Sequence, residues 1–212
     1  MKTCYIVCAL DCTLDFNISD EDIVIAADKG YEQLKKSGYR PNVVIGDFDS
    51  YVGKINCENI IKYPVKKDDT DSALAVEYAI NHGYKNIVIY GAIGGTLDHT
   101  IANISLLSRY SIKGINIVLI DENNVLFAIS DRNITFDEKA VGRISVFSAT
   151  ERSLGVVEKG LLYELDEVEM KSNISVGVSN EFIGRKAVIS VKKGTLLIYT
   201  SKENYNNHLT TK

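Results

Sequence analysis

The strongest constraint on the fold is a change of rhythm in the distribution of apolar residues along the chain. The first half alternates short apolar runs, typical of buried strands, with segments whose apolar residues recur at helical spacing. Such alternation predicts a parallel sheet covered by helices. The expected strands are residues 3–9, 22–27, 42–46, 60–63, 86–90 and 116–120, and the expected helices are residues 30–37, 70–81 and 97–110.

After residue 121 the helical spacing ends, and short strand-like runs follow one another, separated by turn-forming residues such as 131–133 and 192–194. This spacing favours a β-sandwich or a barrel. We therefore expect an α/β domain over residues 1–122 and an all-β domain over residues 123–212, with a polar end from residue 201 that frays. The expected strands are residues 125–130, 133–136, 143–148, 155–158, 175–178, 187–191 and 195–200.

Composition places the chain among globular proteins and restricts its partners. Of the 212 residues, 45% are hydrophobic and 25% are charged with both signs mixed, so nothing in the composition favours disorder. The formal net charge is −4 and no run of Lys or Arg stands out, which disfavours a nucleic-acid partner. An acidic chain that binds a polyanion needs metal ions, local basic residues or backbone donors to offset the repulsion.

The cysteines and the start of the chain bear on the cellular compartment. Cys4, Cys8 and Cys12 are spaced by four residues, and Cys57 stands apart. A metal cluster is one interpretation, but structural zinc sites pair their cysteines with a second pair nearby, so free thiols in a reducing cytosol are favoured. No signal peptide opens the sequence, and no apolar run approaches the ~18 residues of a membrane span. We expect a cytoplasmic protein with no membrane partner.

Acidic residues gather directly after expected strands of the α/β half. The carboxyl ends of parallel strands lie at one edge of a sheet, where open α/β folds bind ligands. Carboxylates there suit Mg²⁺, which takes one or two of them together with phosphate oxygens and water. Neighbouring glycines allow close approach of a ligand, and helix N-termini offer free N–H groups to phosphate. The acidic clusters are Gly46-Asp47-Phe48-Asp49-Ser50, Lys67-Asp68-Asp69-Thr70-Asp71 and Gly94-Gly95-Thr96-Leu97-Asp98-His99.

Each cluster alone has a simpler explanation. Asp and Thr at a helix start usually cap the helix, and we favour this role for Asp69 or Thr70. For Asp98 taken alone, a capping role and a functional role are equally favoured. Asp-rich turns are also common on surfaces. Together, however, the aspartates of these loops crowd negative charge at one edge of the sheet, and a bound divalent cation relieves such crowding. The combined pattern therefore predicts a Mg²⁺ site that serves phosphate chemistry.

The same clusters, in the same order and extended by Asn103, resemble the signature blocks of the thiamine pyrophosphokinase family. Residues 27–30 resemble the family's Asp-x-Gly turn after its second strand. In the β-rich half, residues 160–163 and 177–182 resemble its Gly-Leu-x-Tyr and Ser-Asn-Glu blocks. The resemblance covers nearly the whole chain. One departure is the first loop, residues 8–12, which replaces the Gly-rich turn of many relatives.

The resemblance implies a Rossmann-like parallel α/β domain over residues 1–122 that binds ATP and Mg²⁺, followed by a β-sandwich over residues 123–212 that binds thiamine. It implies a homodimer with sites shared between subunits. The implied reaction transfers pyrophosphate from ATP to the hydroxyl of thiamine and yields thiamine pyrophosphate and AMP. Two alternatives remain open: a pyrophosphokinase for another hydroxymethyl heterocycle such as a pterin, and a non-catalytic sensor of thiamine or a nucleotide.

The resemblance also implies roles for the acidic residues. Asp47, Asp49 and Asp71 hold Mg²⁺ on the ATP phosphates. Asp71, Asp98 and Lys67 support the transfer, and either Asp71 or Asp98 is a candidate acceptor of the hydroxyl proton.

Substrate-contacting positions follow from the same blocks. Asp28 is placed near the nucleotide, and His99, Ser179 and Asn180 near thiamine. Lys29 stands where relatives often carry glycine; it contacts phosphate or is a solvated lysine at a helix start, and the second interpretation is slightly favoured. The full set is Asp28, Lys29, Asp68, Thr70, Gly94, Gly95, His99, Asn103, Ser179 and Asn180.

Overall fold

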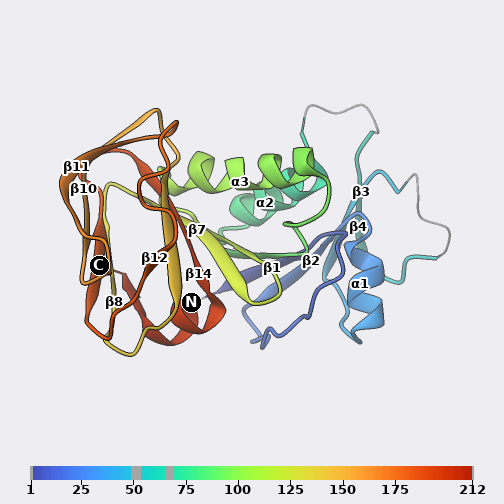
Figure 1. Ribbon diagram of the computed structural model, residues 1–212. Helices are drawn as coiled ribbons and strands as arrows, with labels where there is room; N and C mark the ends of the chain where they lie inside the picture. Colours follow the sequence, from blue (N-terminus) through green and yellow to red (C-terminus); the bar gives the residue numbers. More distant parts are fainter. Residues whose placement is uncertain (1, 49–53, 65–68, 212) are drawn as a thin grey trace. The chain divides into compact units, whose positions relative to one another are not determined.

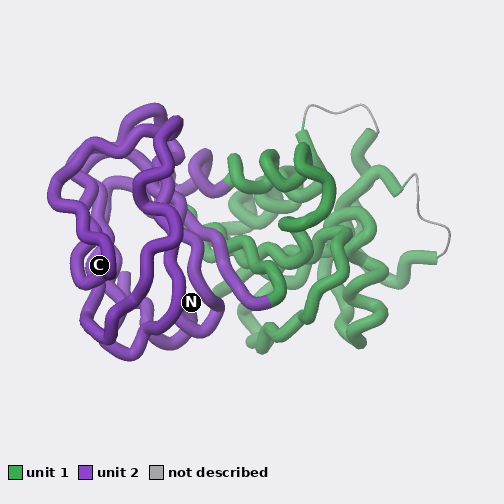
Figure 2. Tube along the Cα trace, viewed as in Figure 1, with its two compact units in different colours: residues 1–106, 115–122 green, residues 107–114, 123–212 purple. Residues whose placement is uncertain are grey.

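A computed structural model describes residues 2–48, 54–64 and 69–211 of the chain (Figure 1). The protein divides into two compact units, unit 1 with residues 1–106 and 115–122 and unit 2 with residues 107–114 and 123–212 (Figure 2). Within the described ranges, no helix combines the length and the hydropathy that a membrane span requires. The functional domains assigned to residues 1–122 and 123–212 stay a prediction.

Unit 1 is built on a parallel sheet, as the alternation in the sequence predicted. Its strands lie in the order β6-β5-β1-β2-β3-β4, and neighbouring strands pair in parallel. Figure 1 shows α1 on one face of this sheet and α2 on the other, as right-handed crossovers require. The elements are β1 (Thr3–Val7), β2 (Ile23–Ala27), α1 (Gly30–Lys36), β3 (Val43–Gly46), β4 (Asn59–Lys62), α2 (Asp71–Asn81), β5 (Asn86–Tyr90), α3 (Leu97–Ser111) and β6 (Asn116–Ile120). The end of α3, from residue 107, belongs to unit 2.

The chain order of the sheet reverses between β1 and β5. From β1 the chain proceeds outward through β2, β3 and β4, and it then returns to place β5 and β6 on the other side of β1. Open α/β sheets bind ligands at the carboxyl ends of the strands that flank such a reversal. The topology of unit 1 therefore points to one place for a ligand, the edge where β1 and β5 end.

Two glycines allow the backbone to crowd around the end of β1. A Cβ at residue 30 would collide with the carbonyl oxygen of Val7, so only glycine lets α1 begin this close to the strand. Gly91 has a φ of 66°, and a Cβ there would lie 2.5 Å from the carbonyl oxygen of Leu10. The loops after β1, β2 and β5 are thereby held close together.

Unit 2 consists of two antiparallel sheets (Figure 1). One has the order β12-β9-β14-β7 within unit 2, and the other the order β11-β10-β13-β8-β15. Burial alternates along β9, where Ile144, Val146 and Ser148 are buried, as expected for a strand with one solvated face. The strands are β7 (Asn124–Ser130), β8 (Asn133–Phe136), β9 (Arg143–Ser148), β10 (Arg152–Lys159), β11 (Leu165–Lys171), β12 (Asn180–Glu181), β13 (Ala187–Ser190), β14 (Thr195–Ser201) and β15 (Leu209–Thr211).

Two details of the predicted strand pattern in unit 2 are wrong. Residues 175–178 form turns and no strand, although the carbonyl oxygen of Gly177 accepts a hydrogen bond of 2.8 Å from the N–H of Val146. The sequence analysis also missed β11, whose sequence is rich in charge. Within β11 only Met170 is buried, because the strand lies at the edge of its sheet and exposes most of its side chains. An edge strand lacks the apolar alternation from which strands are recognised.

The expected fraying of residues 201–212 is also wrong for the described part of that segment. Residues Asn204–His208 form a π-helical turn, and β15 then pairs with β8. The buried side chain of Asn204 anchors the turn: its Oδ1 accepts from the N–H of Val141 at 3.1 Å, and its Nδ2 donates to the oxygen of Val141 at 2.9 Å. The polar composition of the segment suggested solvent exposure, but the polar side chain of Asn204 is buried and forms internal hydrogen bonds.

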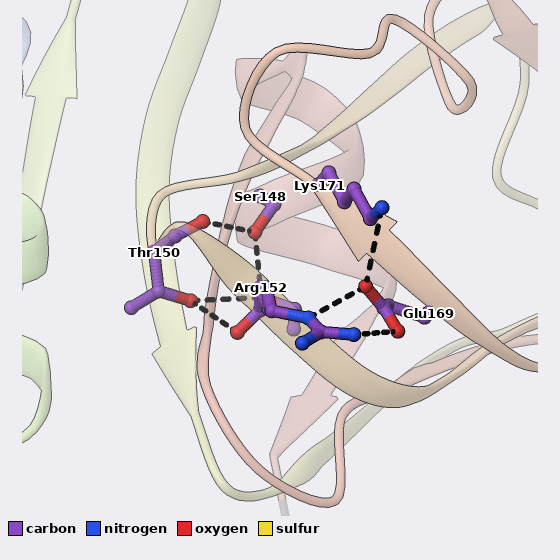
Figure 3. Close-up of polar contacts among 6 residues, drawn as sticks. Ser148, Thr150, Arg152, Glu169 and Lys171 are labelled. Atoms are coloured by element: carbon purple, nitrogen blue, oxygen red, sulfur yellow. Dashed lines mark hydrogen bonds and ion pairs between the residues drawn. The ribbon is translucent and has the colours of Figure 1, made fainter.

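A network of polar contacts holds the turn between β9 and β10 and the start of β10 (Figure 3). The hydroxyl of Ser148 donates to the oxygen of Thr150 at 2.7 Å, and the hydroxyl of Thr150 donates to the oxygen of Arg152 at 3.1 Å. Arg152 binds both carboxylate oxygens of Glu169 at 2.7 Å, and Lys171 lies 3.8 Å from the same carboxylate. The network joins β10 to the polar edge strand β11.

Candidate active site

A pocket of about 350 Å³ opens where the reversal of strand order predicts a ligand site. The loops after β1, β2 and β5 and the first turns of α2 and α3 form its walls. Its size suits a small-molecule substrate. The lining residues are Cys8, Ala9, Leu10, Ala27, Asp28, Lys29, Thr70, Asp71, Ser72, Gly91, Ala92, Gly95, Thr96, His99, Thr100 and Asn103.

Carboxylates converge on this pocket from different strand ends. Asp28 follows β2 with a φ of 48°, a left-handed conformation rare outside glycine, and its N–H donates to the oxygen of Ile45 at 2.8 Å. Burial, and further the negative charges of Asp71 and Asp47, raise the pKa of the Asp28 carboxyl, although a hydrogen bond from the N–H of Lys29 opposes the shift. The Asp28 carboxyl therefore lies near enough to Asp71 and to Asp47 for their negative charges to add to the effect of burial.

A divalent cation would relieve this crowding of negative charge, and carboxylates are ligands that Mg²⁺ accepts. Mg²⁺ takes one or two carboxylates from a protein and completes its shell with phosphate oxygens and water. Asp71 lines the pocket with Asp28, whereas Asp47 is outside the lining and acts on Asp28 through its charge. Across the described ranges, no group of three or more His, Cys, Asp or Glu side chains is placed to hold a metal ion by itself. Asp49, Lys67 and Asp68, three predicted site residues, lie outside the described residues.

The start of α2 confirms the capping interpretation of Thr70. Thr70 is the N-cap residue, and its hydroxyl accepts a hydrogen bond of 3.2 Å from the N–H of Ala73. Asp71 occupies the first turn, where the helix dipole favours a carboxylate. Thr70 and Asp71 both line the pocket, so the cap also fixes the position of the Asp71 carboxylate.

A buried hydrogen-bond chain ties α2 to α3 beside the pocket. The hydroxyl of Ser72 donates to Oδ1 of Asn103 at 2.6 Å, and Nδ2 of Asn103 donates to the oxygen of Ala92 at 2.8 Å. Asn103 therefore lines the pocket, as predicted, while its amide holds the loop after β5 in place. The sequence analysis missed Ser72; its one signal was a position directly after Asp71.

The third acidic cluster is only partly brought to the pocket. Gly95 and His99 line it, whereas Gly94 and Asp98 are outside the lining. A hydrogen bond from Thr96 and one of 2.8 Å from the N–H of His99 lower the pKa of the exposed Asp98 carboxyl. Asp98 thus satisfies backbone donors of the first turn of α3 in this structure. Its part in the transfer stays a prediction.

Residues of the first two loops add to the pocket wall. Lys29 lines the pocket while its side chain is exposed, a placement open to a phosphate contact and to solvation alike. Cys8 also lines the pocket, and burial raises the pKa of its thiol to about 12, so the thiol is neutral. Cys4, Cys8, Cys12 and Cys57 take part in no disulfide, as expected.

A second pocket, of about 320 Å³, lies within unit 2. It is lined by Glu158, Tyr163, Leu165, Ser175, Val176, Gly177, Val178 and Asn180. The wall therefore combines the two blocks of the β-rich half singled out in the sequence, with a buried Glu that the sequence analysis missed. Ser179 is exposed and not part of the lining; its φ is 57°, and its N–H donates to the hydroxyl of Ser145 at 3.0 Å.

Asn180 lines this pocket but directs its amide inward. Its Oδ1 accepts from the N–H groups of Tyr163 and Glu181 at 2.9 and 3.0 Å. Its Nδ2 donates to Oε2 of Glu158 at 2.9 Å and to the oxygen of Tyr163 at 2.7 Å. Each polar atom of the amide thus has two internal partners, so Asn180 positions the turn that carries Tyr163.

Comparisons with known proteins agree on one family for both parts of the chain. Residues 15–119 match the family model "Thiamin pyrophosphokinase, catalytic domain", and residues 132–196 match "Thiamin pyrophosphokinase, vitamin B1 binding domain". Thiamine pyrophosphokinase of Bacillus subtilis is 31% identical over 188 residues, covering 84% of this chain and 87% of the relative. Thiamin pyrophosphokinase 1 of Caenorhabditis elegans is 25% identical over 190 residues, covering 82% of this chain and 76% of the relative.

Solved structures show the same similarity. The crystal structure of thiamine pyrophosphokinase from Bacillus subtilis superimposes with a TM-score of 0.81 at 26% identity and covers 94% of this chain and 98% of that one. The enzyme from Geobacillus thermodenitrificans gives a TM-score of 0.79 at 26% identity, with coverage of 94% and 97%. Two successive family models, a relative of similar length and these structures lead to one conclusion: the chain belongs to the thiamin pyrophosphokinase family.

Proposed function

We propose that the chain is a thiamine diphosphokinase, which transfers the pyrophosphoryl group of ATP to the hydroxyl group of thiamine and releases AMP. Its family membership and the catalytic and vitamin-binding models matched by its two parts support this reaction. The observation that carries the proposal is the acidic pocket at the reversal of strand order, which lies within the stretch matched by the catalytic model.

In this reaction the hydroxyl oxygen of thiamine forms a bond to the β-phosphorus, and the bond from that phosphorus to the oxygen of AMP breaks. The hydroxyl proton passes to a base or to solvent. Such transfers depend on alignment and on neutralisation of charge far more than on covalent work by the protein. The residues of the pocket serve these two needs. N–H groups at the helix N-termini and at the glycines would bind the phosphates, and the carboxylates would hold a cation that neutralises their charge.

Bound Mg²⁺ would neutralise charge on the phosphate oxygens and on the departing AMP. Asp47 and Asp71 are the described residues that would hold it, together with Asp49 of the same predicted set. Asp28, half-buried beside them, adds to the negative potential. Lys29 at the pocket wall offers a point charge to phosphate.

The same proposal covers the finer description of the fold. We assign unit 1 to the Rossmann-like class on the basis of its parallel sheet and reversed strand order, and unit 2 to the β-sandwich class on the basis of its antiparallel sheets. The pocket of unit 2 is then the place for thiamine, since it lies in the stretch matched by the vitamin-binding model. A cytoplasmic location stays a prediction.

The identity of the leaving group tests the reaction. With ATP, Mg²⁺ and thiamine, the purified protein should produce AMP and thiamine pyrophosphate in equal amounts, because attack at the β-phosphorus releases AMP. Mass spectrometry of the products measures both. Formation of ADP and thiamine monophosphate would instead identify an ordinary kinase. Product only with a hydroxymethyl pterin, or binding of thiamine with no turnover, would point to the other pyrophosphokinases or to a sensor.

We further propose a homodimer whose sites are shared between subunits. The phosphate chemistry is in unit 1 of one chain, and the acceptor pocket is supplied by unit 2 of the partner. A two-fold axis makes such an exchange reciprocal and gives two equal sites.

Mixing two inactive variants tests this assembly. Asp71→Asn removes a pocket carboxylate of unit 1, and Tyr163→Ala removes the exposed ring at the pocket of unit 2. After confirmed subunit exchange, about half of the dimers are mixed, and one of their two sites is intact. Activity should therefore return to about a quarter of the wild-type value. Sites within single chains would give no recovery, and a monomer in sedimentation would exclude the arrangement altogether.

A further inference from the structure

The pocket of unit 2 contains a buried carboxyl group that phosphate transfer does not use. Glu158, on β10, is 0% exposed and lines the pocket together with Tyr163 and Asn180. Its Oε2 accepts a hydrogen bond of 2.9 Å from Nδ2 of Asn180. Its Oε1 is buried and has no hydrogen-bond partner in the part of the chain that the structure describes. A buried acceptor left unpaired is costly, which marks this oxygen as a place for a proton or a ligand charge.

The unpaired oxygen lies directly beneath the backbone of Gly177, another residue of the pocket wall. A Cβ at residue 177 would lie 2.9 Å from Oε1 of Glu158 and 2.5 Å from the oxygen of Val146. Only glycine therefore leaves the backbone this close to the carboxyl group. The methyl group of Met170 lies 3.2 Å from the same Cβ position, so the surroundings of the carboxyl are largely apolar.

These surroundings disfavour a charged carboxylate while the pocket is empty. Burial raises the pKa of Glu158 to about 7, although the hydrogen bond from Asn180 opposes the shift. The carboxyl is therefore partly protonated at neutral pH. An opposite charge within about 4–6 Å lowers the pKa of a carboxyl by 1–3 units, and the effect is strong where the dielectric is low.

Charged groups on the surrounding elements form ion pairs, bind backbone groups or are exposed, and none of them is a cause of this shift. Strand β13 carries no ionisable residue, and Glu164 accepts from the N–H of Gly160 at 2.8 Å. Arg143 on β9 and Lys186 before β13 are exposed. The ion pairs are Lys159–Asp166 at 3.1 Å, Lys192–Glu167 at 2.7 Å, Arg152–Glu169 at 2.7 Å and Lys171–Glu169 at 3.8 Å.

We propose that Glu158 is a specificity-determining residue of the acceptor pocket: its carboxylate lies beneath the bound acceptor, selects a cationic heteroaromatic ring, and releases its proton to solvent when that ring binds. The inference rests on the proposed function, in which the acceptor is thiamine with its positively charged thiazolium ring. Tyr163, 65% exposed at the pocket, offers the aromatic face that such a ring also prefers. A cationic ring bound next to Gly177 would place a positive charge near Oε1, which has no hydrogen-bond partner among the described residues.

Proton release on binding is the direct consequence. Thiamine is titrated calorimetrically at pH 7 into the full chain saturated with Mg²⁺ and α,β-methylene-ATP, in buffers of different ionisation enthalpy. If binding lowers the pKa of Glu158 by one unit from about 7, about 0.4 proton is released per thiamine. The Kd should fall by about fivefold between pH 6 and pH 8 for the same shift. A neutral thiophene isostere of thiamine should release no proton.

Glu158→Gln keeps the shape and an acceptor for Asn180 but removes the charge. When the Gln variant binds thiamine, no proton should be released from residue 158, and the Kd should no longer depend on pH through this residue. The preference of the variant for thiamine over the neutral isostere should be about tenfold smaller than that of the wild type. Glu151→Gln, an exposed carboxylate before the same strand, is the matched control and should behave like the wild type. Thermal unfolding checks folding. Because burial raises the folded-state pKa of Glu158 from 4.5 to about 7, the wild-type free energy of unfolding should decrease as pH rises between these two values, and the Gln variant should lack this decrease.

The outcomes separate this inference from the function on which it rests. Equal proton release by the wild type and Glu158→Gln, or equal affinity of the wild type for thiamine and its neutral isostere, would overturn the role of Glu158 while the enzyme still makes thiamine pyrophosphate. Absence of thiamine binding together with absence of thiamine pyrophosphate would overturn both. Proton release that is present in the wild type and lost only in Glu158→Gln supports the proposal.

Discussion

Replacing Asp71 by Asn should lower the turnover number for thiamine pyrophosphate formation by at least about a hundredfold. Asp71 starts α2, lines the pocket of unit 1, and contributes to the repulsion that raises the pKa of Asp28. The substitution keeps the size of the side chain and removes the charge that would hold a divalent cation. Release of AMP, followed over time at saturating ATP and thiamine, measures the effect.

The same substitution should leave the fold nearly unchanged. The Asn variant loses a favourable contact with the helix dipole, about 0.3–1 kcal/mol, and gains relief from the repulsion between Asp71 and Asp28. Asp20→Asn, an exposed Asp in a turn of the same unit, is the matched control and should retain full turnover. Wild-type turnover in the Asp71 variant would remove this residue from the catalytic site, whatever its effect on stability.

Replacing Asn180 by Ala should destabilise unit 2 by roughly 3–5 kcal/mol, one of the largest effects expected for a single substitution. The amide is 2% exposed, and its loss deprives the N–H of Tyr163 and the carboxyl group of Glu158 of their partners. The chain lacks Trp, so urea unfolding followed by circular dichroism and tyrosine fluorescence is the suitable measurement. The midpoint of the unfolding transition of unit 2 should shift to a clearly lower urea concentration.

An exposed asparagine provides the control for that experiment. Asn173, in the turn after β11, is exposed, and Asn173→Ala should change the unfolding free energy by less than about 0.5 kcal/mol. If Asn180→Ala were as stable as this control and only lost affinity for thiamine, Asn180 would be a direct ligand of the acceptor. Destabilisation of unit 2 confirms the positioning role that its four hydrogen bonds indicate.

Much of unit 1 followed from local patterns in the sequence. The alternation of apolar runs and helical spacing predicted its parallel sheet, and a helix cap was expected at Asp69 or Thr70, of which Thr70 is the N-cap residue. Asp28 and Asp71 were named from blocks of neighbouring residues, and both line the pocket. Periodicity and capping act within a few residues of the chain, so they are readable without knowing what lies opposite.

The sequence was less informative about unit 2. Strand β11 lies at a sheet edge and lacks apolar alternation, and the polar segment that ends in β15 is held by the buried side chain of Asn204. Residues 175–178 alternate like a strand, yet they form the wall of a pocket. The polarity of a residue does not determine whether its side chain contacts water, a neighbouring strand or a ligand.

The sequence by itself thus predicted the parallel sheet of unit 1, the β-rich character of the second half, the family and several residues of the pocket of unit 1, among them Asp28, Asp71 and Asn103. The tertiary structure alone decided which polar side chains form the internal hydrogen bonds that hold the pocket walls in place. Ser72 meets Asn103 across 31 positions of the chain, and Asn180 meets Glu158 across 22. Burial and hydrogen-bond partners depend on such distant contacts, and a buried carboxyl group has its pKa set by them. For that reason Glu158 is visible only in the folded protein.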